Sequence, residues 1–355
     1  MSNIKIFITY KDRHTVIESS ILTPIQTGRA VASEVFKDMI GDDTGENISS
    51  RNDKYSELSA MYWVWKNYNK IGNPEYVGFM HYRRQFVFNE TLGLPYPQWI
   101  ASYYYIPSVR EATPFFSDDA IEGIVPQFDY LAPKYSVTPF FDIRQEYIEA
   151  IPGSKGEIFD TFIQVCRKIH PEWEEEISKV EKGNVVQVCN MFVMKKELFF
   201  NYCNFAFPVL FELERRIDEM KIVTKETRFL GYMAEKLQTM FMFRLEKEKK
   251  YKGKLLNCLY IIPELSHISS SYNNISSDVS LRLELERIHF PNINNQFKLS
   301  YIMNHLLKFR LKKFYYGFGK LFVFGDKYKE YNDKYEKAKK LIVDAKKMRR
   351  FYGRI

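Results

Sequence analysis

Strand patterns alternate with helical patterns over the first 265 residues of the chain. Residues 3–10 (NIKIFITY) alternate around Ile4, Ile6 and Ile8, as a strand does. Further strand patterns lie at 76–88, 128–132, 185–194 and 256–265. Helical patterns lie at 58–65, 118–124, 141–181, from near 197, and at 226–247. This alternation predicts an α/β fold, a sheet with helices on its faces.

The composition of the chain changes near residue 266. Residues 267–279 are rich in Ser and Asn and predict a linker. The net charge of the whole chain is +8, and residues 301–355 alone hold sixteen Lys and Arg against five Asp and Glu. We therefore expect one domain at 1–266, a linker at 267–279 and a basic, aromatic helical tail at 280–355.

The cysteines and the apolar runs indicate a cellular compartment. The four cysteines show no CxxC spacing, which favours reduced thiols over a disulfide framework or a zinc site. The chain enters a strand pattern almost at once, without the apolar core of a signal peptide. No run reaches the roughly 18 apolar residues that cross a bilayer. These features predict a cytoplasmic protein.

Four polar residues, His81-Tyr82-Arg83-Arg84, lie within or at the end of the apolar strand pattern at 76–88. Unpaired charge is costly in a core, and open α/β sheets bind ligands at the carboxyl ends of their strands. Two arginines at such a place suit bidentate contacts to a pyrophosphate. The alternative is an edge strand whose arginines form ion pairs.

A polar loop at 41–53 contains the acidic run Asp42-Asp43-Thr44-Gly45-Glu46-Asn47. Clustered carboxylates suit a divalent cation or a hydroxyl-rich ligand such as a sugar. The alternative is a solvated turn that caps the following helix.

Two further polar features lie later in the domain. Asn190 stands in the apolar run VVQVCNMFVM and needs a hydrogen-bond partner, which a loop backbone also provides. On the helix at 226–247, Arg228, Gly231 and Glu235 share one face, and apolar residues share the other. The first face predicts a cleft where Gly231 leaves room for a ligand and Glu235 acts as a base. A solvated face fits the same periodicity.

Several well-known motifs are missing. The chain has no GxGxxG, GxxxxGK[ST], GxSxG or HExxH, so dinucleotide and P-loop sites lack their fingerprints. The DxD pair with which many nucleotide-sugar enzymes hold a metal is also missing from the expected strand end.

The run DDTGENISSRNDKYSELSAMYWVWKN, followed by EYVGFMHYRRQF, resembles a bacterial family first catalogued as a domain of unknown function. Members of that family sit among capsular, exopolysaccharide and O-antigen glycosyltransferases, and some are galactofuranosyltransferases. The family patterns TGxNIS, ELTxxYWxWKN, YxGxxHYRRxF, NMFxMKxExF and RxxGxxxERL follow in order within residues 4–265. Two positions depart from the family: ITxHK is ITYK here, and ERL is Glu235-Lys236-Leu237.

The resemblance implies a GT-A-like fold, with the diphosphate of a UDP-sugar near the strand end that usually carries DxD. HYRR occupies that place, so we expect Arg83 and Arg84 to neutralise the leaving diphosphate. The implied sugar is galactofuranose or galactose, and a divalent cation (Mn or Mg) is compatible with the motifs but not required by them. The expected donor-binding residues are Tyr10, Lys11, His81, Arg83, Arg84, Asn190 and Arg228. The expected acceptor- or sugar-binding residues are Asp42, Thr44, Asn47 and Glu57, and the expected bases are Glu235 and, second, Asp43.

The basic tail at 301–355 predicts an amphipathic segment on the anionic inner face of the plasma membrane, where lipid-linked saccharide acceptors are found. A solvated appendage or an oligomerisation arm fits the same composition, and nucleic-acid binding has no motif behind it.

The predicted function is glycosyl transfer to a lipid-linked or oligosaccharide acceptor in capsule, exopolysaccharide or O-antigen synthesis. The alternatives are a membrane- or nucleic-acid-binding protein with an α/β scaffold, and a polysaccharide phosphotransferase.

Overall fold

The computed structural model describes residues 3–92, 103–106, 108–137, 142–150, 155–222, 224 and 226–261, and short helical stretches between 310 and 336. The chain forms two compact units, residues 1–269 and residues 270–355. The expected linker at 267–279 lies outside the described residues. Within the described ranges, every helix is too short or too polar to span a membrane.

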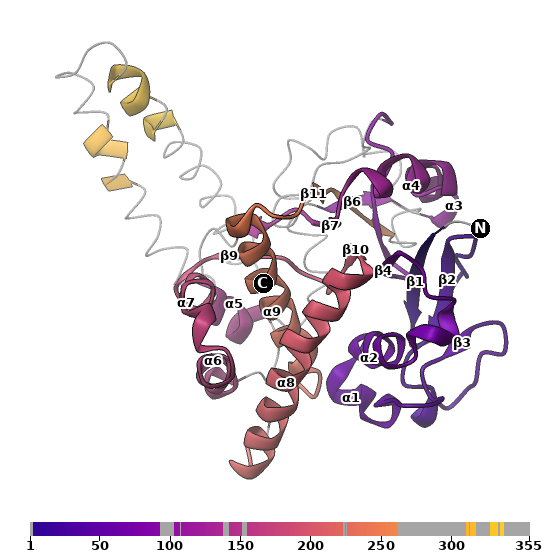
Figure 1. Cartoon of the computed structure of the whole chain (residues 1–355). Helices are drawn as coiled ribbons and strands as arrows, with labels where there is room; N and C mark the ends of the chain where they lie inside the picture. Colours follow the sequence, from indigo (N-terminus) through magenta and orange to yellow (C-terminus); the bar gives the residue numbers. More distant parts are fainter. Residues whose placement is uncertain are drawn as a thin grey trace, which may run out of the picture. The chain divides into compact units, whose positions relative to one another are not determined.

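A mixed sheet of ten strands organises the described part of the first unit (Figure 1). Seven strands follow the order β11-β7-β10-β4-β1-β2-β3, and β5, β6 and β12 extend the sheet from β4. Their bounds are β1 Ile4–Tyr10, β2 Leu22–Gln26, β3 Ile40–Gly41, β4 Tyr76–His81, β5 Arg84–Phe86, β6 Tyr103–Ile106, β7 Tyr130–Pro133, β10 Phe192–Lys195, β11 Gly253–Leu256 and β12 Cys258–Ile261. A separate pair joins β8 (Ser136–Val137) to β9 (Val185–Val186).

The strand directions bring two carboxyl ends together. Strand β1 lies between β2 and β4 and runs parallel to both. Strand β10 lies antiparallel between β4 and β7. The carboxyl ends of β1 and β4 therefore lie side by side at one edge, where an open α/β sheet binds ligands. The expectation of an α/β sheet with flanking helices is confirmed, and the sheet is mixed.

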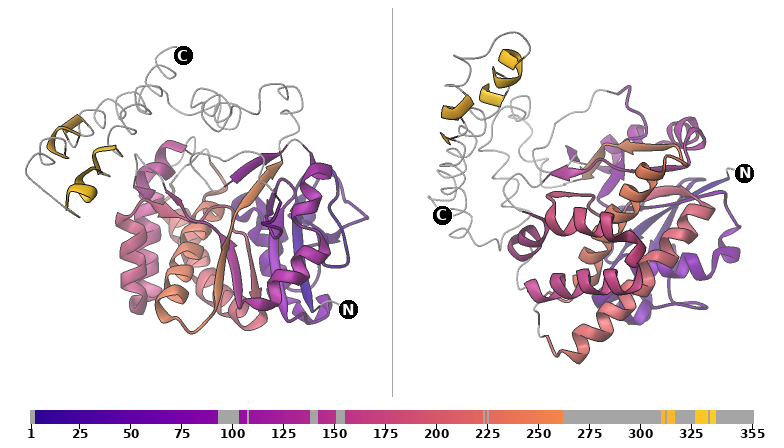
Figure 2. Two further views of the ribbon diagram at one scale, coloured as in Figure 1. Left: turned by 90° about the horizontal axis from the view of Figure 1, so that it is seen from above. Right: turned by 60° about the vertical axis from the view of Figure 1, so that its left-hand side comes forward.

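Helices cover the sheet and supply most of the core (Figures 1 and 2). Their bounds are α1 Asn52–Tyr55, α2 Leu58–Lys66, α3 Val109–Ala112, α4 Asp118–Ile124, α5 Ile143–Ala150, α6 Gly156–Ile169, α7 Glu174–Lys182, α8 Lys196–Glu219 and α9 Phe229–Glu248. Helices α8 and α9 pack together, and α6 packs against α8. Phe7, Phe79 and Phe192 of three adjacent strands join this helical core, and Ile6 and Ile8 are buried on the opposite face of β1.

Three of the expected strands are interrupted. The pattern at 76–88 is a hairpin, because β4 ends at His81 and β5 starts at Arg84 in antiparallel register with it. The pattern at 185–194 is β9 and β10, separated at Cys189 and Asn190 by left-handed backbone. The pattern at 256–265 falls on the ends of β11 and on β12. Alternation of apolar residues does not reveal these breaks, because each break keeps apolar residues on both sides of it.

Candidate functional site

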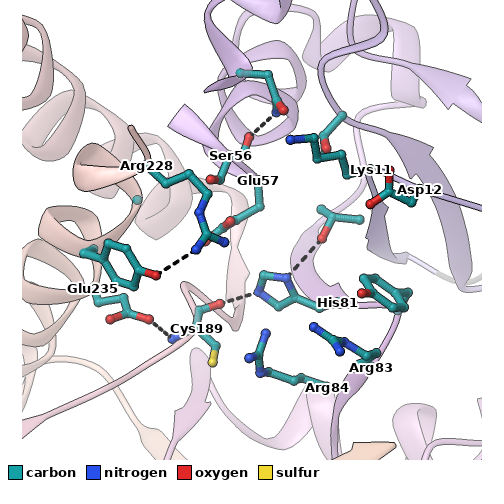
Figure 3. A pocket seen from close by; sticks show the side chains of 16 residues that line it. Lys11, Asp12, Ser56, Glu57, His81, Arg83, Arg84, Cys189, Arg228 and Glu235 are labelled. Carbon is teal, nitrogen blue, oxygen red and sulfur yellow. Dashed lines mark hydrogen bonds between the residues drawn. The ribbon is translucent and has the colours of Figure 1, made fainter. Parts of the chain in front are cut away.

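A pocket of about 470 Å³ opens at the carboxyl ends of β1 and β4 (Figure 3). It is bordered by the end of β1, the segment around α1, the β4–β5 hairpin, Cys189 and the first two turns of α9. Its lining residues are Thr9, Lys11, Asp12, Thr27, Asn52, Ser56, Glu57, His81, Tyr82, Arg83, Arg84, Cys189, Arg228, Gly231, Tyr232 and Glu235. The structure thus brings together seven predicted site residues: Lys11, Glu57, His81, Arg83, Arg84, Arg228 and Glu235.

The β4–β5 hairpin carries two of the cations that line the pocket, Arg83 and Arg84. The guanidinium of Arg83 lies 5.1 Å from the ring centre of Tyr82, and that of Arg84 lies 4.8 Å from the ring centre of Tyr260. Arg83 forms no ion pair with a carboxylate among the described residues, and its buried Nε has no acceptor. Figure 3 shows both arginines extending toward the space that Glu235 borders from the other side. A guanidinium with unused donors in a pocket is suited to binding an anion.

His81 joins the two strand ends to the loop before β10. Its Nε2 lies 2.5 Å from the carbonyl oxygen of Cys189, and its Nδ1 lies 3.3 Å from Oγ1 of Thr9. A carbonyl only accepts, so Nε2 carries the proton. Burial, first, and the nearby arginines lower the pKa of His81, although Glu57 opposes them. The ring is therefore neutral near pH 7, and it positions the Cys189 carbonyl.

Cys189 and Asn190 form a left-handed turn that binds two carboxylates of the pocket, Glu57 and Glu235. Their φ angles are 79° and 45°, values that non-glycine residues adopt at a cost. The backbone N–H of Cys189 donates to Oε1 of Glu235 at 2.6 Å. The side-chain amide of Asn190 donates to Oε1 of Glu57 at 2.6 Å and to the carbonyl of Gly231 at 3.0 Å. Asn190 thus orients a pocket residue and does not itself line the pocket.

Glu235 is a half-buried carboxylate of the pocket, with a side chain that is 13% exposed. Burial, as the largest cause, raises the pKa of its carboxyl, and the Lys236 ammonium and the Cys189 N–H oppose this rise. Nζ of Lys236 lies 3.4 Å from Oε2 of Glu235 and 3.8 Å from Oε2 of Glu146. A carboxylate with a raised pKa and few hydrogen bonds is suited to accepting a proton.

Arg228 lies on the same side of the pocket as Glu235. Its guanidinium forms an ion pair with Glu226 at 3.1 Å and donates to the Tyr232 hydroxyl at 3.0 Å. Because Glu226 already balances its charge, Arg228 is a weaker candidate for binding a diphosphate than Arg83.

Two of the predicted residues are buried away from the pocket lining. The Tyr10 hydroxyl donates to the Thr15 carbonyl at 3.2 Å and accepts from the Ile17 N–H at 2.8 Å. Asp42 accepts from the backbone N–H groups of Gly28 and Arg29 and from the hydroxyls of Ser49 and Ser59. The oxygens of Asp42 are thereby engaged within the protein, and its carboxylate fixes the loop after β2 to α2.

The remaining three predicted residues, Asp43, Thr44 and Asn47, lie in the loop after β3 and outside the pocket lining. The Thr44 carbonyl accepts from the indole of Trp63 at 2.6 Å. Asn47 donates to the Gly45 carbonyl at 2.9 Å within its own loop. These contacts stabilise the loop, and the predicted ligand roles of its residues stay predictions.

Asp12, Ser56 and Tyr82 line the pocket without having been predicted as site residues. Asp12 is the second residue after the end of β1, a position that marks it as a candidate from the sequence. Ser56 lines the pocket because its backbone has φ 50° and ψ −131°, which no sequence pattern reveals. In the part of the chain that the structure describes, no group of three or more His, Cys, Asp or Glu side chains could hold a metal ion.

The geometry defines an α/β protein with a pocket at the strand ends that is lined by both arginines and carboxylates. Residues 5–248 match the family described as domain of unknown function DUF4422, and the chain belongs to this family. No curated protein matches the chain. Among solved structures, the chain is similar to WbbM, a bifunctional glycosyltransferase, with a TM-score of 0.65 and 28% sequence identity. The similarity covers 73% of this chain and 45% of WbbM, so the chain spans less than half the length of that protein.

Proposed function

We propose that the first unit is a glycosyltransferase of the GT-A type that uses a UDP-sugar. The observation that carries this proposal is one pocket in which the cations Lys11, Arg83 and Arg84 face the carboxylates Glu57 and Glu235. A nucleotide-sugar needs both, because its diphosphate binds cations and its sugar hydroxyls bind carboxylates. The similarity to WbbM supports the same class of reaction.

The diphosphate is proposed to bind Arg83, Arg84 and Lys11. A second pocket of about 330 Å³ adjoins the first and shares Lys11, Asp12, Thr27 and Asn52 with it. Val31, Ala32 and Phe36 give this second pocket an apolar wall, which suits the nucleoside. The two pockets together match a ligand with a flat base, a charged centre and a polar sugar.

The proposed reaction breaks the bond between the sugar C1 and the diphosphate oxygen and forms a bond between C1 and an acceptor oxygen. The bonding electrons leave with the diphosphate, where Arg83 and Arg84 stabilise the developing charge. The acceptor hydroxyl gives its proton to a carboxylate, and Glu235 is the first candidate because it lines the pocket. Asp43 lies outside the lining and remains the second candidate.

The finer features of the substrate follow from the motif resemblance. We propose galactofuranose or galactose as the transferred sugar and a lipid-linked or oligosaccharide acceptor of capsule, exopolysaccharide or O-antigen synthesis. Mn²⁺ or Mg²⁺ bound to the diphosphate is compatible with this arrangement.

A panel of nucleotide sugars, assayed with and without a chelator for release of UDP and for sugar in the product, tests the proposal. We expect UDP release from a UDP-hexose that depends on acceptor. Phosphate in the product in place of sugar would indicate a polysaccharide phosphotransferase. A chain that binds neither UDP nor any UDP-sugar would indicate a non-enzymatic scaffold.

We also propose that the second unit binds an anionic membrane surface. Phe314 and Tyr315 of its described helical stretches are 73% and 61% exposed, and Lys313, Lys327 and Lys329 lie in the same stretches. Exposed aromatic and basic side chains together favour an anionic lipid interface. The full chain should float with vesicles that contain phosphatidylglycerol, and exchange of the three lysines for Glu should reduce this binding. Equal binding of both proteins would contradict the proposal.

A further inference from the structure

Gly231 borders the pocket in the first turn of α9. A Cβ atom added to Gly231 meets only Ser56, at 3.6 Å from Oγ and 3.7 Å from Cβ. Both distances are ordinary van der Waals contacts. The protein itself would therefore accept alanine at this position without rearrangement.

The backbone also gives no reason for glycine at this position. Gly231 is absent from the glycines with positive φ, which in the described chain are Gly28, Gly45 and Gly72. Glycine is a poor helix former, and alanine is the best. Neither steric crowding by the protein nor backbone conformation requires glycine at position 231. The space next to Gly231 is therefore available to a bound ligand.

The neighbours of Gly231 indicate what fills this space. Ser56 lies within van der Waals distance of the position of the added Cβ. Glu57 lines the same pocket, as do Tyr232 and Glu235 of α9. Hydroxyls and carboxylates of this kind bind sugar hydroxyls, and an aromatic ring packs on a sugar face. The cations Arg83 and Arg84 belong to the hairpin across the same pocket.

We propose that the sugar ring of the donor lies directly against the backbone of Gly231, which makes this glycine a specificity-determining residue. The inference rests on the proposed function. The sugar is bonded to the diphosphate, so it must occupy the part of the pocket next to the cations. The Asn190 amide binds both Glu57 and the Gly231 carbonyl, which fixes the carboxylate and the glycine relative to each other.

Titration calorimetry of Gly231→Ala with UDP, UDP-galactose and UDP-galactofuranose tests this inference. We expect the Kd for UDP to change less than about twofold, and the Kd for the accepted UDP-sugar to rise on the order of tenfold or more, as for one excess methyl group in a fitted site. The melting temperature should be unchanged or higher, because alanine favours the helix. Gly123→Ala is the matched control: Gly123 is an exposed residue of α4 whose added Cβ meets no atom within 4 Å.

Three results would overturn the inference. Equal weakening of UDP and UDP-sugar binding would assign the space to the diphosphate. Unchanged UDP-sugar binding would assign it to the acceptor or to nothing. A clearly lower melting temperature would show that the protein itself needs glycine. A wild-type chain that binds no UDP and no UDP-sugar would overturn the proposed function first, before any variant is compared.

Discussion

The side-chain amide of Asn190 donates a hydrogen bond of 2.6 Å to Oε1 of Glu57, across 133 residues of sequence. Asn190 is 1% exposed, so this bond is sheltered from water. The next residue toward the N-terminus, Cys189, binds Glu235 through its backbone. One left-handed turn therefore binds two of the carboxylates that line the pocket, Glu57 and Glu235.

Replacing Asn190 should impair catalysis more than binding of the nucleotide. Asn190→Ala removes the donor to Glu57. We expect turnover to fall about tenfold, which is the effect of roughly one lost charge-assisted hydrogen bond. The Kd for UDP should be unchanged. The free energy of unfolding should fall by about 1–3 kcal/mol, because buried groups lose their partners. Asn69→Ala, at an exposed position, serves as the control. Unchanged turnover in Asn190→Ala would remove the orienting role.

The sequence predicted which distant residues come together in one pocket better than it predicted the bounds of the strands around that pocket. The motifs that contain Glu57, Arg83 and Arg228 lie far apart in the sequence, and their side chains line one pocket. Each motif combines polar residues with a strand or helix end, and such ends gather at one edge of an α/β sheet. Because strand and helix ends meet at one edge of the sheet, the sequence was sufficient to predict that these residues lie close together.

Other features depend on information that the sequence does not show. Strand β2 was not predicted from the sequence, because it is short and contains Pro24, a residue that disfavours a strand. Pro24 pairs with Ile8 of β1 on one side of β2. On the other side, β3 pairs only with Ile25 and Gln26. Proline is tolerated at position 24 because no described strand pairs with it on that side. The turn at Cys189 and the ligands of Asp42 depend on backbone geometry and on distant residues, which no local pattern specifies.

The rate of transfer should fall as the pH is lowered, and this fall should occur at a higher pH than for a base with an ordinary carboxyl pKa. Glu235 must be ionised to act as a base, and burial raises its pKa above its ordinary value. As the pH is lowered, Glu235 is therefore protonated, and so inactivated, at a higher pH than an ordinary carboxyl, for which the pKa is about 4.3. Among the charged groups around it, Glu57 and Glu146 raise this pKa and Lys236 lowers it.

Lys236→Met removes the cation that favours the ionised form of Glu235. We expect the acid limb of kcat/KM to move to higher pH in this variant. Glu235→Gln should lose about 10²- to 10⁴-fold in rate, as for loss of a general base. Identical pH profiles for Lys236→Met and the wild type, or full activity of Glu235→Gln, would rule out Glu235 as the base.

Two neighbouring aspartates should differ in their effect on stability. Asp42 is fully buried with four protein donors, whereas Asp43 is exposed. Asp42→Ala should lower the free energy of unfolding by about 3 kcal/mol or more, because buried donors lose their acceptor. Asp43→Ala should change it by less than about 0.5 kcal/mol. Urea denaturation measures both, and equal effects would contradict the structural role of Asp42.

The most direct test of the account is the affinity of Arg83→Ala for UDP, measured by titration calorimetry. Arg83 presents donors to the pocket without a carboxylate partner among the described residues, so its loss should raise the Kd about 10- to 100-fold, the equivalent of one or two charge-assisted hydrogen bonds. Arg215→Ala, on an exposed part of α8, should bind UDP like the wild type. An unchanged Kd in Arg83→Ala would contradict the claim that this pocket binds the diphosphate of a sugar donor.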